Sequence, residues 1–108
     1  CFIENTIQIN LLAATAEDEA KNQVYNVAVG DRTTLNTLLG SIRTALTENE
    51  VPVYSITTYR DFRPGDVRHS QADISKAINA LRYAPEYRIL AGIQKAMPWY
   101  IGFMKKQE

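Results

Sequence analysis

The stretch "VYNVAVGDRTTLNTLL", residues 24–39, carries the strongest fold signal in this chain. Its first part, residues 24–29, is a short apolar run typical of a strand that is covered on both faces. Gly30 and Asp31 break the run, and Thr33 or Thr34 is placed to cap a following helix. Apolar residues recur in that helix at the spacing of one helical face: Leu35, Leu38, Leu39, Ile42, Ala45 and Leu46. A strand, a tight turn and a capped helix in this order favour an α/β fold.

The segments on either side of this stretch continue the alternation. Asn5 or Thr6 is placed to cap a first helix, which the polar run 17–22 ends. After the central helix, residues 51–59 are rich in β-branched side chains and predict a second strand, with Pro52 near its start where it costs little.

Two further helices are predicted towards the C-terminus. The first is short and carries Ile74, Ile78 and Leu81 on one face. The second follows Pro85 and carries Ile93, Ala96, Met97, Tyr100 and Met104. Pro98 inside this pattern requires either a kink or a new helix start. The whole order is helix, strand, helix, strand, helix, helix, which predicts a small sheet flanked by helices.

Length and charge limit the classes of function. With 108 residues, 45% of them hydrophobic, the chain is expected to form one domain over residues 1–108. Lys plus Arg and Asp plus Glu are 12 each, so no basic field is available to attract nucleic acid or an anionic membrane. No apolar stretch has the length of a membrane span, and the lone Cys1 fits a reducing compartment. We therefore expect a cytoplasmic protein without a nucleic-acid or membrane partner.

The tetrapeptide Arg63-Pro64-Gly65-Asp66 is the first candidate binding element. Pro followed by Gly predicts a type II turn, which brings the corner residues Arg63 and Asp66 to within about 7 Å of each other. A guanidinium can bind phosphate oxygens with paired hydrogen bonds, and a carboxylate can accept hydrogen bonds from two neighbouring hydroxyls. The turn therefore predicts either a site for a phosphorylated, hydroxyl-rich ligand or a simple exposed ion pair.

Leu35 is the second candidate. Open α/β folds bind ligands beyond the carboxyl ends of their strands, where the next helix begins. Leu35 lies in the first turn of the central helix, so it is placed either to offer an apolar surface to a flat ring or to pack in the core. The two roles are compatible.

Catalytic and cofactor motifs are not found in the sequence. The five glycines form no dinucleotide-binding fingerprint, and none of the six tyrosines has a lysine four positions later. His69 has no second histidine or cysteine nearby, which favours a hydrogen-bonding role over metal binding. We therefore expect no catalytic residues, no metal and no cofactor bound by this chain.

Four stretches closely resemble one enzyme family. They are "VYNVAVGDRTTLNTLL", "YRDFRPGDVRHSQADISKA", "LRYAPEY" and "AMPWYI". They resemble the C-terminal third of the extended short-chain dehydrogenase/reductase nucleotide-sugar epimerases, and most closely the UDP-N-acetylglucosamine 4-epimerases. The resemblance covers essentially the whole chain. It implies the C-terminal part of the extended SDR fold without its Rossmann domain, which in that family binds NAD and carries a Tyr-x-x-x-Lys pair.

The resemblance also implies a ligand and a role for each candidate residue. Arg63 would contact the diphosphate of a UDP-sugar, Asp66 the ribose hydroxyls, and Leu35 the uracil. The chain would be the UDP-sugar-binding part of an NAD-dependent UDP-N-acetylglucosamine/UDP-glucose 4-epimerase of surface-polysaccharide (O-antigen or capsule) biosynthesis. Its ligand would be UDP-GlcNAc/UDP-GalNAc or UDP-Glc/UDP-Gal, and it would not catalyse the reaction by itself. Because residues 1–3 read as the end of a strand and lack an initial Met, we expect a longer polypeptide with an N-terminal domain. The alternative is a stand-alone, non-enzymatic binding module derived from such an enzyme, with homo-oligomer formation possible.

Overall fold

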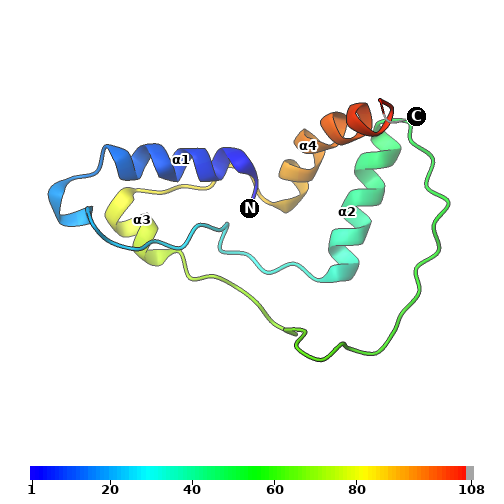
Figure 1. Ribbon diagram of the computed structural model, residues 1–108, viewed down its shortest axis with the longest axis horizontal. Coiled ribbons are helices and arrows are strands. Elements are labelled where there is room, and N and C mark those ends of the chain that lie inside the picture. Colours follow the sequence, from blue (N-terminus) through cyan, green and yellow to red (C-terminus); the bar gives the residue numbers. More distant parts are fainter. Residues whose placement is uncertain (107–108) are drawn as a thin grey trace.

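The computed structural model describes residues 1–106, and its regular elements are all helices (Figure 1). In chain order they are α1 (Ile3–Ala14), the short 3₁₀ helix η1 (Asp18–Ala20), α2 (Leu35–Glu48), α3 (Ser75–Leu81) and α4 (Ile89–Met104). Long extended segments connect η1 to α2 and α2 to α3. Two pairs of helices pack together, α1 with α3 and α2 with α4.

The predicted sheet is wrong, because the structure has no strand within residues 1–106. Residues 24–29 and 51–59 are irregular, and side chains take up several of their backbone carbonyls in place of a neighbouring strand. Lys76 Nζ donates to the Val24 carbonyl at 3.0 Å, and Arg43 Nη2 donates to the Ser55 carbonyl at 2.8 Å. The fold is therefore all-helical and not α/β, and it does not match the C-terminal part of an extended SDR fold.

The helix predicted after Thr33 or Thr34 is confirmed as α2. Thr34 is the residue that caps it, because its Oγ1 accepts the Thr37 backbone N–H at 3.1 Å. The short helix α3 also lies where the sequence predicts it, directly after Ile74.

The start of α1 corrects two expectations. The helix begins at Ile3 after Phe2, so residues 1–3 are not the end of a strand. Asn5 lies inside the helix, and neither Asn5 nor Thr6 caps it. Asn5 is instead buried, with only 1% of its surface exposed.

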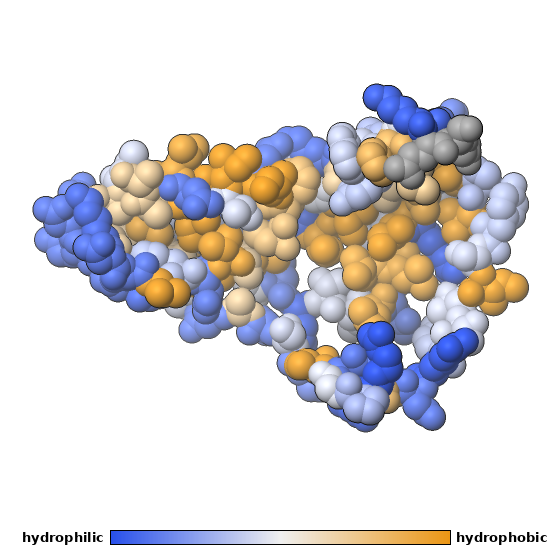
Figure 2. Space-filling view, in the orientation of Figure 1, coloured by the Kyte–Doolittle hydropathy of each residue, from blue (hydrophilic) through white to orange (hydrophobic). Residues whose placement is uncertain are grey.

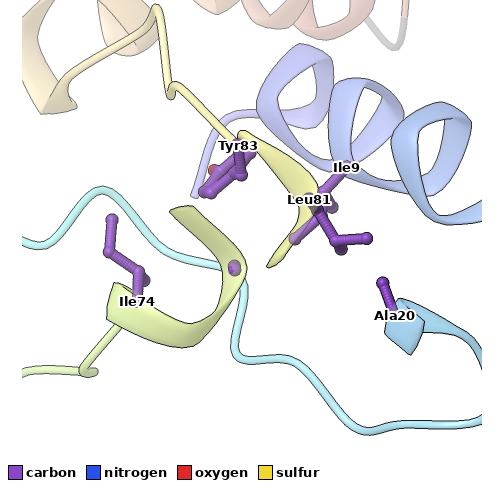
Figure 3. Packing of buried hydrophobic residues seen from close by; sticks show 6 residues of the cluster. Ile9, Ala20, Ile74, Leu81 and Tyr83 are labelled. Carbon is purple, nitrogen blue, oxygen red and sulfur yellow. The ribbon is translucent and has the colours of Figure 1, made fainter. Parts of the chain in front are cut away.

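The main hydrophobic core lies between α1, α3 and the segments beside them (Figure 3). Its buried members are Ile9, Ala20, Ile74, Ala77, Leu81 and Tyr83. Tyr83 is the largest of them, and its hydroxyl donates to the Ala28 carbonyl at 2.9 Å. This hydrogen bond satisfies the one polar atom of the side chain in the core and holds the irregular segment 24–29 against it.

The second helix pair has fewer buried apolar side chains, Ala45 of α2 and Met97 of α4. α4 continues through Pro98 as one helix, and its axis changes direction along its length in Figure 1. Proline lacks the N–H that would bond to the carbonyl four residues earlier, and its ring crowds that carbonyl, so a kink is the expected result. No helix within residues 1–106 is long and apolar enough to cross a membrane.

The two helix pairs meet where the beginnings of α1 and α4 touch. The Phe2 ring packs against Tyr87 with ring centres 5.0 Å apart, and it also lies directly against Gly92. Lys95 Nζ forms an ion pair with Glu4 Oε1 at 2.8 Å across the same contact.

The structure is open and elongated. Its extents are 53 × 35 × 21 Å and its radius of gyration is 17.4 Å, whereas a compact chain of this length has about 13 Å. Its accessible surface is 8834 Å², against about 6,100 Å² for a compact chain of this mass. Apolar side chains consequently reach the surface over the α2 and α4 region (Figure 2).

Candidate functional site

The predicted turn at residues 63–66 is present. The Asp66 backbone N–H donates to the Arg63 carbonyl at 3.1 Å, which closes the turn. Gly65 has a φ of 87°, the positive value that a type II turn requires at its third position and that favours glycine. The Pro-Gly pair thus determines the local backbone, and Arg63 and Asp66 flank it as the sequence predicts.

Arg63 and Asp66 bond to each other. Arg63 Nε lies 3.3 Å from Asp66 Oδ2, its Nη2 lies 3.4 Å from Oδ1, and its backbone N–H also donates to Oδ2. The two side chains are 85% and 36% exposed. A long, exposed pair of this kind contributes at most about 1 kcal/mol, so it opens readily when a stronger partner is present.

Contacts further along join this region to the loop before α2. Gln71 Nε2 donates to the Gly30 carbonyl at 2.6 Å, and Arg32 Nη1 lies 3.5 Å from His69 Nδ1. Gly30 has a φ of 73° and lies so close to Ile74 that an added Cβ would be 3.3 Å from its Cδ1. The loop before α2 is therefore held against residues 69–74, a few positions after the turn.

Leu35, the first residue of α2, is 81% exposed and does not contribute to the core. It therefore remains available as an apolar surface, one of the two roles that the sequence leaves open. Within residues 1–106, no described contact joins Leu35 directly to Arg63 or Asp66. The three candidates belong to two segments that touch through Arg32 and His69.

Arg32 is the residue of this region that the sequence reasoning did not select. The signal that points to it is its position directly after Gly30-Asp31, in the loop already selected as a ligand-facing element. Its neighbour Asp31 is bonded elsewhere, to the Arg88 guanidinium, and this bond raises the pKa of Arg88. Arg32 is thus the charged residue of the loop that remains for a ligand.

Other features of the chain carry no chemistry that we can assign. A partly open hollow of about 270 Å³ lies between α4 and residues 1–2, which precede α1, and is lined mainly by apolar residues such as Phe2, Ile93 and Tyr100. Neither this hollow nor a shallower one beside α1 includes a candidate site residue. In the described part of the chain, no three His, Cys, Asp or Glu side chains come together as metal ligands do.

Comparison with known proteins shows a weak similarity to a curated protein. No protein-family model matches the chain. It is 28% identical over 87 residues to Protein CapI of Staphylococcus aureus, a match that covers 81% of this chain and 25% of that protein. The chain thus spans about a quarter of the length of this relative.

These findings contradict the assignment to the extended SDR nucleotide-sugar epimerases. The identity is low, no family model supports the assignment, and residues 1–106 contain helices but no sheet. The same findings contradict the protein classes that the resemblance implied: extended SDR, isomerase and NAD-dependent epimerase/dehydratase.

Proposed function

We propose that this chain binds the UDP part of a UDP-sugar through the turn 63–66 and the neighbouring loop 30–35, without catalysing a reaction by itself. The observation that carries the proposal is the exposed and weak pairing of Arg63 with Asp66 on one turn.

The chemistry of the turn supports a ligand that has an anion and hydroxyls side by side. The Arg63 guanidinium offers several donors in one plane, and phosphate oxygens bind such a group with two hydrogen bonds. Once released from Arg63, the Asp66 carboxylate can accept from two adjacent ribose hydroxyls. Breaking the existing pair costs little, because both groups are already partly in water.

The loop before α2 supports the nucleoside part of the proposal. Leu35 is an exposed apolar side chain at the helix start, where a flat uracil ring can lie against it. The Gln71 bond to Gly30 holds this loop beside the segment that follows the turn. We therefore propose that the uracil of a nucleotide bound at the turn packs against Leu35.

The proposal is one of binding alone. We expect UDP binding without NAD binding, and no turnover of a UDP-sugar by the chain on its own.

A second candidate is a stand-alone interaction module that self-associates. The observation that favours it is the large accessible surface, 8834 Å², with many exposed apolar side chains. Light scattering, which measures the molar mass, tests self-association separately from UDP binding. A monomeric mass at all concentrations would contradict self-association and leave the UDP proposal unaffected.

The test of UDP binding is a calorimetric titration of the chain and four variants. Arg63→Ala and Asp66→Ala remove the proposed contacts, whereas Arg60→Ala and Asp61→Ala remove equally exposed charges of the same signs from the same segment. We expect the first two to weaken UDP binding about tenfold, as the loss of a charge-assisted hydrogen bond does, and the other two to change it little. No binding by the folded chain, or equal effects of all four variants, would contradict the proposal.

Leu35→Ser tests the uracil contact separately. It should weaken binding of UDP but leave binding of inorganic pyrophosphate unchanged, since pyrophosphate has no base. Equal weakening of both ligands would show that Leu35 acts through the shape of the loop and not through the ring.

A further inference from the structure

The lone histidine of the chain lies beside an arginine from a distant segment. Arg32 Nη1 and His69 Nδ1 are 3.5 Å apart, although 37 positions separate the residues in sequence. Both side chains belong to exposed residues, so their outer faces are open to a ligand. Two contacts close to this pair in sequence also join the two segments. Gln71 donates a hydrogen bond to the Gly30 carbonyl, and Gly30 packs against Ile74.

The chemistry of the contact determines which atoms face outward. A guanidinium has only donors, so a hydrogen bond between the two groups needs Nδ1 of His69 as the acceptor. The proton of the neutral ring is then on Nε2, which points away from Arg32 as a free donor. Arg32 keeps its remaining N–H groups, so the pair presents donors from two side chains and no acceptor.

We propose that Arg32 and His69 together bind a phosphate group, the second phosphate of a diphosphate whose first phosphate is bound by Arg63 of the turn. This inference rests on the proposed function and extends its site. His69 follows Asp66 by three positions, so their Cα atoms are at most about 10 Å apart. A diphosphate that is bound by Arg63 and extends towards the loop before α2 is therefore expected to lie near the N–H groups of Arg32 and His69.

The pair also explains how a chain with balanced charge binds an anion. Lys plus Arg equals Asp plus Glu over the whole sequence, so long-range attraction is weak. The carboxylate nearest to Arg32 in sequence, Asp31, is already paired with Arg88. The donors of Arg32 and His69 are therefore not neutralised by the acidic residue of their own loop.

The test compares UDP with UMP, which lacks the second phosphate. Calorimetric affinities of both nucleotides are measured for the wild-type chain, Arg32→Gln and His69→Gln, with Arg82→Gln as the control on the exposed end of α3. We expect Arg32→Gln and His69→Gln to reduce the preference for UDP over UMP about fivefold, the effect of losing one exposed charge-assisted contact. UMP binding itself should stay unchanged, as should both affinities in the control.

The outcomes separate this inference from the proposal on which it rests. If the wild-type chain binds UDP but the two variants keep its preference over UMP, Arg32 and His69 do not bind the second phosphate, and the turn proposal stands. If they weaken UMP and UDP equally, they act through the loop and the inference is again wrong. If the folded wild-type chain binds neither nucleotide, both proposals are wrong.

Discussion

The side-chain amide of Asn5 is paired on both sides with the backbone around Tyr87. Its Nδ2 donates to the Tyr87 carbonyl at 2.7 Å, while its Oδ1 accepts the backbone N–H groups of Glu86 and Tyr87 at 3.0 and 3.1 Å. The side chain is almost completely buried. One residue of α1 thus satisfies three backbone groups of the segment that joins α3 to α4.

Asn5→Ala should therefore destabilise the fold by about 1–3 kcal/mol, because it removes three hydrogen bonds of a buried side chain to part-buried backbone groups. The measurement is the free energy of unfolding from urea titration monitored by circular dichroism. Asn10→Ala is the matched control, since Asn10 is an exposed residue of the same helix whose amide bonds only to the Thr6 carbonyl. Equal losses for both variants would mean that the Asn5 bonds do not stabilise the fold.

Thr34→Ala should weaken α2 by about 1 kcal/mol, because it removes the oxygen that accepts the Thr37 N–H at the helix start. Thr33→Ala removes the same atoms from the preceding exposed position and should change the unfolding free energy by less than about 0.5 kcal/mol. Helicity and urea midpoints of the two variants provide the comparison. A larger loss for Thr33→Ala would show that the cap is at Thr33.

Two glycines of α4 should respond oppositely to alanine. An added Cβ at Gly102 meets nothing within 4 Å, so Gly102→Ala should stabilise the helix by up to about 1 kcal/mol. At Gly92 the Cβ would lie 3.0 Å from the Phe2 Cβ, so Gly92→Ala must displace the ring that packs on Tyr87. We expect it to be less stable than Gly102→Ala by about 1 kcal/mol or more in thermal unfolding. Equal stabilisation by both would contradict the close contact between α4 and Phe2.

Stability should fall in acid partly through Glu4. Its bond with Lys95 holds the Glu4 pKa below the ordinary value of 4.5. A lowered pKa in the folded state means that the bond stabilises the fold above about pH 4.5 and that this contribution is lost as the pH falls through the folded-state pKa. Glu4→Gln should therefore lose less stability than the wild type as the pH is lowered from 5. Parallel pH curves for Glu4→Gln and the wild type would contradict this assignment.

Local patterns predicted the parts of the fold that depend on neighbours in sequence. α2 follows from its apolar spacing and its Thr34 cap, and the turn at residues 63–66 follows from Pro64 and Gly65. Both elements are determined within a few residues, which is the range that propensity and periodicity describe.

The predictions that failed depend on distant partners. Residues 24–29 have the composition of a buried strand, but a strand also needs a neighbour for its backbone, and composition does not show whether one is present. Asn5 has the character of a helix cap, yet its side chain is used by a backbone segment that begins 81 positions later. The same limit applies to the candidate site, where the turn was found but the meeting of Arg32 and His69 was not.

The bonds of Asn5 also have a consequence for biosynthesis. A ribosome makes the chain from its N-terminus, so α1 leaves it well before Glu86 and Tyr87 exist. At the usual 5–20 residues per second, the 81 positions between Asn5 and Glu86 correspond to roughly 4 to 16 seconds of translation. During that interval the Asn5 amide has none of its three native backbone partners, although residues that pack on Ile9, such as Ala20, are already made. The first helix therefore completes its native contacts only when the last quarter of the chain has been made.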